Sequence, residues 1–241
     1  MSFETVFESA KGGDQNAQVA MGYLFYKGDG VVQDRREAAK WFGLAADQGN
    51  AEAMCALGFM RSHGHGLRAD QQKALELYQK AADLGNARAM FNLAFMYSDV
   101  TEIEQDWEKA LYWYTRAAEE GNLVALYRVG VIYEEGRGVP ADPAKAAKIY
   151  DECLDNGYPR AGYRLGLMHL EGRGFPRGPD RASKYMAKAA NLGDGDAMCV
   201  LGKMSLTGEG MVKSEANAKK WFGKAAVRGS AEAKELLDSM E

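Results

Sequence analysis

Residues 17–49 read AQVAMGYLFYKGDGVVQDRREAAKWFGLAADQG, and most of the chain repeats this stretch with variations. Its last residue, Gly49, and its central Ala38 both recur at intervals of 36 residues. A period in the range of about 20 to 50 residues is typical of stacked supersecondary units. The glycine row comprises Gly13, Gly49, Gly85, Gly121, Gly157, Gly193 and Gly229, and the alanine row comprises Ala38, Ala74, Ala110, Ala146, Ala182 and Ala218. The sequence therefore predicts a repeat protein.

Each repeat divides into two predicted helices, here called helix A and helix B. In the first repeat, helix A covers residues 15–27 and places Ala17, Met21 and Leu24 on one face. Asp14 precedes it as a capping residue, and Asp34 with Glu37 forms a capping-box pattern at the start of helix B. Small residues in helix A face aromatic pairs in helix B, which predicts closely packed helical hairpins.

The loop between helices A and B carries two glycines in most repeats, followed by one apolar residue that we expect to anchor in the core. The third repeat departs from this pattern, since residues 99–106 read DVTEIEQD and contain no glycine. An extension of helix A is one way to close this loop. Trp107, directly after it, is then a partly exposed aromatic and a candidate contact residue.

The 36-residue period predicts a single elongated domain over residues 1–241, because each repeat contacts only its neighbours in such a fold. The predicted segments are an N-terminal capping helix at about 3–13, six repeats at 14–49, 50–85, 86–121, 122–157, 158–193 and 194–229, and a C-terminal capping helix at 230–241.

These units resemble the Sel-one-like repeat (SLR) family, a relative of the 34-residue tetratricopeptide repeat. The shared features are a Gly in mid-helix A, the G-x-G loop, D-x-x-x-A before an aromatic pair, and A-A-x-x-G at the end. The resemblance implies an all-α, right-handed α/α solenoid (superhelix), with A helices lining a concave groove. It also implies an adaptor or scaffold function. Some bacterial members carry one disulfide per repeat, and this chain has no cysteine pair within any unit.

Composition limits the classes of partner and compartment. The net charge of −4 argues against a nucleic-acid partner, because nucleic-acid-binding proteins usually carry a basic surface. The sequence contains no stretch of about 20 apolar residues that would predict a membrane span. The three cysteines suit a reducing compartment. We expect a cytoplasmic monomer, or a periplasmic or secreted protein if a signal segment has been removed.

The candidate binding residues lie where helix A varies between repeats, because these positions are not fixed by packing. Repeats three to five combine aromatic and basic residues there, a composition typical of interface hot spots. We expect a protein or peptide partner with acidic and apolar groups, bound in the groove. The predicted partner-binding residues are Arg88, Phe91, Asn92, Phe95, Trp107, Tyr127, Arg128, Val131, Arg160, Tyr163, Arg164 and Leu167.

Other interpretations of these residues remain open. The aromatics can instead pack between adjacent helices while the arginines pair with nearby carboxylates. A dedicated inhibitor or immunity-type protein that clamps one toxin or enzyme would use the same groove. The His63-Gly64-His65 loop suggests a metal- or small-ligand-binding protein as a further alternative. The sequence shows no catalytic motif, so we expect no enzymatic activity, no catalytic or metal site and no cofactor.

Overall fold

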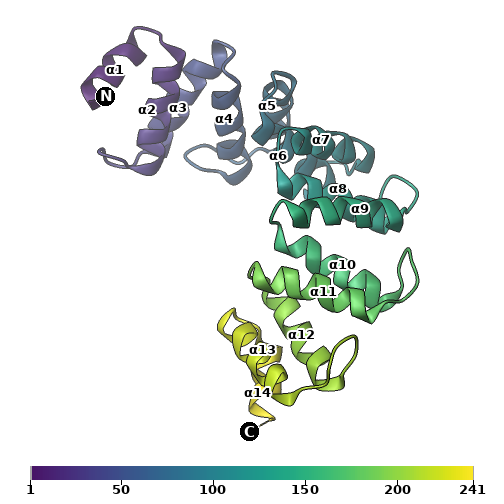
Figure 1. The fold of residues 1–241 in the computed structure, drawn as a ribbon. Coiled ribbons are helices and arrows are strands. Elements are labelled where there is room, and N and C mark those ends of the chain that lie inside the picture. Colours follow the sequence, from purple (N-terminus) through teal and green to yellow (C-terminus); the bar gives the residue numbers. More distant parts are fainter. Residues whose placement is uncertain (1, 241) are drawn as a thin grey trace. The chain divides into compact units, whose positions relative to one another are not determined.

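The computed structural model describes residues 2–240, and in that range the regular secondary structure is entirely α-helical, as predicted (Figure 1). Fourteen helices are present in the described residues, and each of the twelve between the first and the last has 13 residues. In chain order they are α1 (Phe3–Lys11), α2 (Gln15–Lys27), α3 (Arg35–Asp47), α4 (Ala51–His63), α5 (Gln71–Asp83), α6 (Ala87–Asp99), α7 (Trp107–Glu119), α8 (Leu123–Glu135), α9 (Pro143–Asp155), α10 (Pro159–Glu171), α11 (Pro179–Asn191), α12 (Gly195–Thr207), α13 (Glu215–Val227) and α14 (Ala231–Asp238).

Capping side chains set where these helices begin. Asp14 accepts a hydrogen bond from the Ala17 N–H at 2.7 Å, and Asp34 accepts from the N–H groups of Arg36 and Glu37. Such bonds satisfy backbone donors that have no partner within the helix. Helix α10 has no side-chain cap at its start and begins instead with Pro159, whose fixed φ suits the first helical position.

The turn between helices A and B depends on glycine in five of the six repeats. Gly28 ends α2 in the left-handed region with φ of 80°, and Gly30 follows with φ of 72°. In the third repeat Val100 takes this place in an extended conformation, with φ of −90°. Helix α6 ends at Asp99, so the expected extension of helix A is wrong. The loop closes through its buried Ile103, whose N–H donates to the Val100 carbonyl at 3.2 Å.

Close contact between the two helices of a repeat requires the small residue of helix A. A Cβ atom on Gly22 would lie 2.5 Å from the buried ring of Phe42, and one on Gly202 would lie 2.4 Å from that of Phe222. Both distances are well inside van der Waals contact, so these helix pairs approach more closely than alanine would allow. The predicted interlocking of small and aromatic residues is confirmed.

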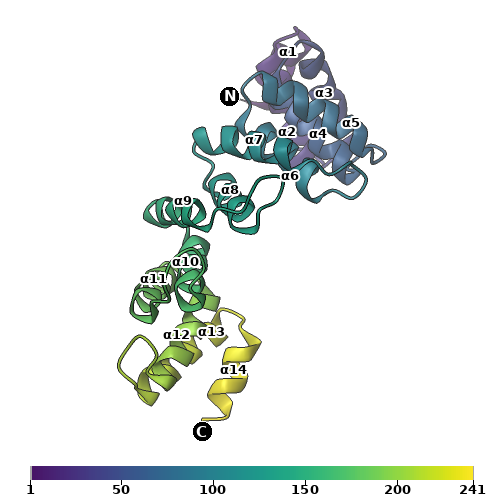
Figure 2. The same cartoon turned by 90° about the vertical axis from the view of Figure 1, so that its right-hand side faces the viewer.

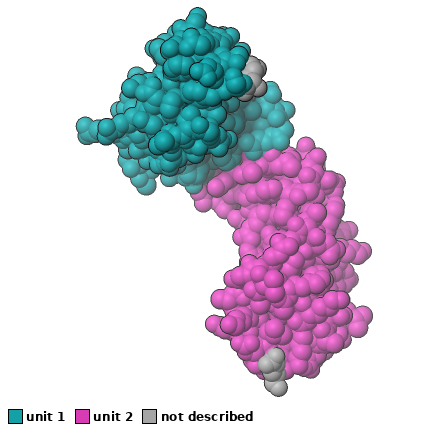
Figure 3. Space-filling model, turned by 90° about the vertical axis from the view of Figure 1, so that its left-hand side faces the viewer, with its two compact units in different colours: residues 1–122 teal, residues 123–241 magenta. Residues whose placement is uncertain are grey.

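The helices form two compact units, unit 1 (Met1–Asn122) and unit 2 (Leu123–Glu241), which are coloured separately in Figure 3. Within each unit, every helix packs against the next one along the chain, and the α10 and α11 pair of unit 2 is visible in Figure 2. The organisation of residues 1–241 as one domain stays a prediction, and its first and last residues lie outside the described range.

The two terminal helices complete the cores at the ends of the chain. In α1, Ala10 is buried, and Phe7 stacks edge-on against Trp41 with the ring centroids 6.0 Å apart. In α14, Ala233 is buried, and Leu236 and Leu237 pack against the core of unit 2. Both helices are shorter than the predicted segments 3–13 and 230–241, and Glu241 of the second segment lies outside the described residues.

Candidate functional site

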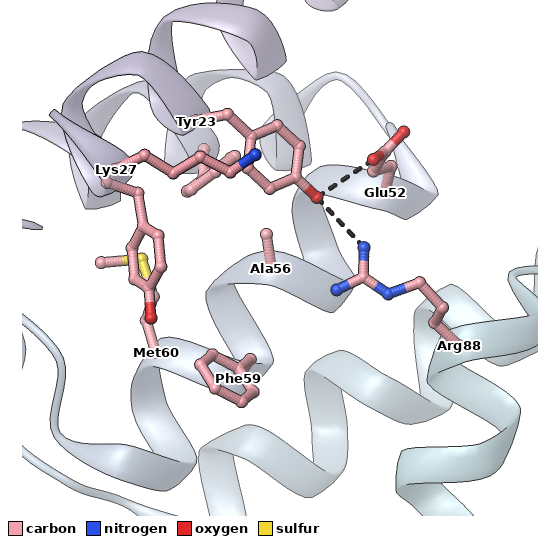
Figure 4. Close-up of a pocket in the computed structure, with 9 residues that line it drawn as sticks. Tyr23, Lys27, Glu52, Ala56, Phe59, Met60 and Arg88 are labelled. Carbon is pink, nitrogen blue, oxygen red and sulfur yellow. Dashed lines mark hydrogen bonds between the residues drawn. The ribbon is translucent and has the colours of Figure 1, made fainter. Parts of the chain in front are cut away.

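Unit 1 contains a cavity of about 550 Å³ between helices α2, α4 and α6, which we call the unit 1 hollow (Figure 4). Three consecutive A helices therefore contribute to one site, together with one residue of α3. Its lining residues are Tyr23, Tyr26, Lys27, Phe42, Glu52, Ala56, Phe59, Met60 and Arg88.

The floor of the hollow is apolar and rigidly packed. Phe42 and Met60 are each 1% exposed, and Ala56 is 7% exposed. The ring of Tyr23 meets the ring of Phe42 edge-on, with the centroids 5.1 Å apart. Because these side chains belong to the core of the repeat as well as to the cavity, the floor is already formed without a ligand.

Charged groups surround this floor. The Tyr23 hydroxyl donates to Glu52 Oε1 at 3.0 Å and accepts from the Arg88 guanidinium at 3.3 Å, as Figure 4 shows. The Lys27 ammonium lies 5.9 Å from the centre of the Tyr23 ring. Burial raises the pKa of Tyr23, so its hydroxyl stays protonated and remains a donor. The rim carries two cations and one carboxylate and is therefore net positive.

The two histidines of the second loop lie next to the hollow and contact its aromatic residues. His63 stacks on Phe59 with centroids 4.1 Å apart, and His65 Nδ1 is 2.8 Å from the Tyr26 hydroxyl. Desolvation, together with the charges of Arg35 and His63, lowers the pKa of His65. Among the described residues, no group of three or more His, Cys, Asp or Glu side chains could hold a metal ion.

The predicted site residues of unit 1 differ in how much of each side chain is exposed and in which residues they contact. Arg88 reaches the hollow, and Phe95 is 40% exposed. Phe91 packs edge-on against Tyr114 at 5.6 Å between centroids, and Asn92 Nδ2 donates to the Cys55 sulfur at 3.9 Å. Trp107 is half-buried at the first position of α7.

In unit 2 the predicted aromatic and aliphatic residues lie partly in the core. Tyr127 packs against Tyr150 and Tyr158, with ring centroids 5.6 and 5.2 Å away. Val131 is partly buried against the core cluster around Tyr150. Tyr163 and Leu167 pack partly against the neighbouring cluster around Met186 and Phe222. Each of these predicted side chains is half-buried, so part of its surface remains accessible.

The predicted arginines of unit 2 have different partners. The Arg160 guanidinium lies 4.6 Å from the centre of the Tyr163 ring and pairs with Asp194 and Asp196. Arg164 donates to the Tyr127 hydroxyl at 3.3 Å and pairs with Glu134 at 3.5 Å. For Arg128, by contrast, no ion pair is found among residues 2–240.

Glu134 is the centre of a buried polar network in unit 2. Its side chain is 2% exposed, accepts a hydrogen bond from the Tyr150 hydroxyl at 2.7 Å and pairs with both Arg164 and Arg173. Loss of Arg164 would remove one of the two cations that compensate this buried carboxylate, which is destabilising. Arg164 therefore contributes to stability, and charge reversal there would disturb the fold as well as the surface.

Of the residues that line the hollow, only Arg88 is among the predicted partner-binding residues, because the strongest sequence signal, the coincidence of aromatic and basic residues, lies in repeats three to five. Lys27 carried a signal of its own, since the equivalent positions in repeats three to five hold Asp99, Glu135 and Glu171. The first repeat therefore carries a cation where three later repeats carry a carboxylate, while His63 and Thr207 stand at the two remaining positions.

The arrangement is suited to binding. Ring faces, two cations and one carboxylate around an apolar floor can hold an apolar side chain and fix the charged groups beside it. In the part of the chain that the structure describes, no helix is long and apolar enough to cross a membrane.

Comparison with known proteins identifies the repeat. The Sel1 repeat model matches residues 15–50, 51–86, 87–122, 123–157, 159–194 and 195–230, close to the predicted boundaries. A Sel1 repeat protein from Oxalobacter formigenes is 30% identical, with a TM-score of 0.77 over 90% of this chain and 89% of that one. Among curated proteins, no sequence matched this chain.

Two further solved structures are similar to the chain. A protective antigen of uropathogenic Escherichia coli that displays an SLR fold is 30% identical, with a TM-score of 0.83 over 98% of this chain. The chain spans 50% of the length of that antigen. An immunity protein from Pseudomonas aeruginosa has a TM-score of 0.53 at 21% identity, covering 90% of this chain and 82% of that one. At this level of identity the likeness is one of fold.

Proposed function

The chain belongs to the Sel1 repeat family, and we propose that it binds a partner protein through the accessible faces of its A helices. Sel1 repeat proteins generally act as protein-interaction scaffolds and are generally non-catalytic. The observation that carries the proposal is the set of incompletely buried aromatic and basic side chains on the A helices. Aromatic residues and arginine are enriched among the residues that dominate protein–protein binding energy.

Each unit has its own proposed binding face, defined by these side chains. The face of unit 1 comprises Arg88, Phe91, Asn92 and Phe95, with Trp107 at the start of helix B (α7) as an additional proposed contact, and the face of unit 2 comprises Tyr127, Arg128, Val131, Arg160, Tyr163, Arg164 and Leu167. Phe95 is the most exposed aromatic of the first face, and Arg128 is the arginine of the second face without an ion-pair partner in residues 2–240. Phe95 is the more accessible of these two side chains, and half-buried Arg128 has no salt bridge to break in the described part of the chain, so substitution of these two residues tests the proposal most directly.

The proposal is tested by affinity capture from the source organism, with mass spectrometry to identify the bound proteins. We expect Phe95→Ala and Arg128→Glu each to reduce capture of the specific partner at least about tenfold, as expected for a contact worth about 1.4 kcal/mol. Tyr112→Ala is the matched control. Tyr112 is an aromatic residue that is 52% exposed, but it lies on α7, which is helix B of the third repeat. Equal capture by all three variants would contradict the proposal.

The same experiment separates a general scaffold from a dedicated inhibitor or immunity-type protein. A single partner bound stoichiometrically at nanomolar affinity would identify the inhibitor, whereas several partners at about micromolar affinity would identify the scaffold. The immunity protein from Pseudomonas aeruginosa shares the fold, which is compatible with either outcome.

A further inference from the structure

We infer that the unit 1 hollow binds an acidic peptide segment that carries one large apolar side chain, and this inference rests on the proposed interaction function. The apolar side chain enters the cavity over Ala56 and Met60. The neighbouring carboxylates of the segment bind Lys27 and Arg88.

The size and lining of the cavity support the apolar part of this ligand. A volume of about 550 Å³ lies within the range of about 300–1,000 Å³ that is typical of pockets for small ligands. The side chains of Phe42 and Met60 are buried beneath it, and the rings of Tyr23 and Phe59 are partly exposed beside it. A phenylalanine or leucine side chain placed there would remove apolar surface of both molecules from water.

The charges at the rim support the acidic part. Neither Lys27 nor Arg88 has an ion-pair partner among residues 2–240, although the chain is net acidic. Glu52 is the one carboxylate of the lining, and the Tyr23 hydroxyl donates to it. A carboxylate of a partner would therefore find two cations that have no salt bridge of their own within the described residues, although Glu52 also acts on Arg88 across the Tyr23 hydroxyl that both contact.

Two arginines at the same repeat position have different partners in this chain. Arg160 occupies the same repeat position as Arg88, two repeats further along, and there the guanidinium pairs with Asp194 and Asp196. Arg88 instead donates to the neutral hydroxyl of Tyr23, which lies 65 residues earlier in the sequence. The chain thus neutralises one of two equivalent arginines and leaves the other available at the edge of an apolar cavity.

The test uses the full chain and fluorescein-labelled, C-terminally amidated peptides, measured by fluorescence anisotropy. The probe peptide is Gly-Ser-Glu-Phe-Glu-Gly-Ser, and two partners replace both Glu by Gln or the Phe by Ser. We expect saturable binding of the probe with a Kd below about 1 mM and at least about tenfold weaker binding of each altered peptide. Binding of the probe should weaken as salt is raised from about 50 to 500 mM.

Three variants locate the binding site. Lys27→Glu and Arg88→Glu should each weaken binding of the probe at least about tenfold, a difference of about 1.4 kcal/mol. Both substitutions should be compatible with folding, because Glu135 and Glu52 occupy these same repeat positions elsewhere in the chain. Ala56→Phe should block the cavity without changing any charge, and because Ala56 is buried, its result is used only if circular dichroism shows the variant to be folded. Lys40→Glu is the control of equal charge, because Lys40 is exposed on α3 and does not line the hollow.

Equal binding of the Glu and Gln peptides would overturn the inference, as would unchanged binding by Lys27→Glu and Arg88→Glu. The absence of any probe binding would overturn it as well. If the peptides fail while Phe95→Ala and Arg128→Glu still abolish partner capture, the inference is wrong and the proposed function stands. If the peptides bind as expected while those two variants capture the partner normally, binding is confined to the hollow and the proposed faces are wrong.

Discussion

At the scale of single residues, the missing methyl group of Gly202 sets how closely α12 and α13 approach each other. A Cβ atom there would lie 2.4 Å from the ring of Phe222, which is fully buried. We expect Gly202→Ala to lower the free energy of unfolding by about 1–3 kcal/mol, because overpacking outweighs the gain of about 1 kcal/mol in helix propensity. Urea unfolding followed by circular dichroism measures this change.

Gly166 supplies a matched control for that substitution. It occupies the same repeat position, but its added Cβ would meet the Met186 side chain, with Cε 2.6 Å, Cγ 2.8 Å and Sδ 2.9 Å away, instead of an aromatic ring. A methionine side chain can change rotamer more readily than a ring can move. Gly166→Ala should therefore cost much less than Gly202→Ala, and equal losses would show that ring contact is not what selects glycine.

The buried His169 should make stability depend on pH. Its ring stacks between Phe175 and Tyr185, and burial followed by the charge of Arg181 lowers its pKa below the ordinary value of about 6.5. The unfolded chain therefore binds the proton more readily than the native one. The native state should lose stability as the pH falls from about 7 through 6.5 toward the lowered pKa.

Thermal unfolding of the wild type and His169→Phe between pH 5 and pH 8 measures this contribution. Phenylalanine keeps the stacked ring but cannot bind a proton. We expect the variant to lose less stability than the wild type on acidification, and the remaining loss includes the contribution of His65, whose pKa is also lowered. An identical pH dependence of both proteins would rule out His169 as the titrating group.

At the scale of the elements, the turns between helices A and B show two ways to end a 13-residue helix. Gly172 ends α10 with φ of 72°, a conformation that L-residues with a side chain rarely adopt, whereas Val100 ends the equivalent turn in an extended conformation. Gly172→Ala should therefore lower the free energy of unfolding by about 1–2 kcal/mol. Chemical denaturation tests this, and Val100→Ala serves as the control, since its φ suits alanine.

The sequence predicted these elements well because each repeat is an independent copy of the same signals. Asp14 and Asp34 mark helix starts, and six copies of such signals fix the boundaries of the helices to within a residue or two. The loop after Asp99 is the exception, because it lacks the glycines that end helix A in the other repeats. Its buried Ile103 lies at the apolar anchor position that the sequence predicted, whereas the extended conformation of Val100 was not predicted.

The site was less predictable for a different reason. Whether an arginine is available depends on which carboxylate its side chain reaches, and these partners lie in other repeats. Arg164 reaches back to Glu134 and Arg160 reaches forward to Asp196, while Arg88 meets Tyr23. Helix periodicity gives the face on which a residue lies. It does not give the rotamers that decide such pairings.

At the scale of the whole molecule, all three cysteines are free and buried. Burial raises the pKa of Cys55 to about 11 and that of Cys153 to about 12, and it also raises the pKa of Cys199. Since the thiolate is the reactive form, we expect the native protein to react slowly with Ellman's reagent at pH 8. In guanidinium chloride all three thiols should react at once. Rapid reaction of any thiol in the native protein would contradict this structure.

The ring of Phe42 constrains how the site can evolve. It fills the space above Gly22 in the core and also forms part of the floor of the unit 1 hollow. A mutation that reshapes this floor also weakens the hairpin of α2 and α3, so selection for folding conserves the floor whatever the ligand is. Lys27, Glu52 and Arg88 do not pack in the core, so selection for folding does not constrain them in this way. Over evolutionary time, related proteins can therefore acquire new binding preferences by exchanging charges around an unchanged apolar base.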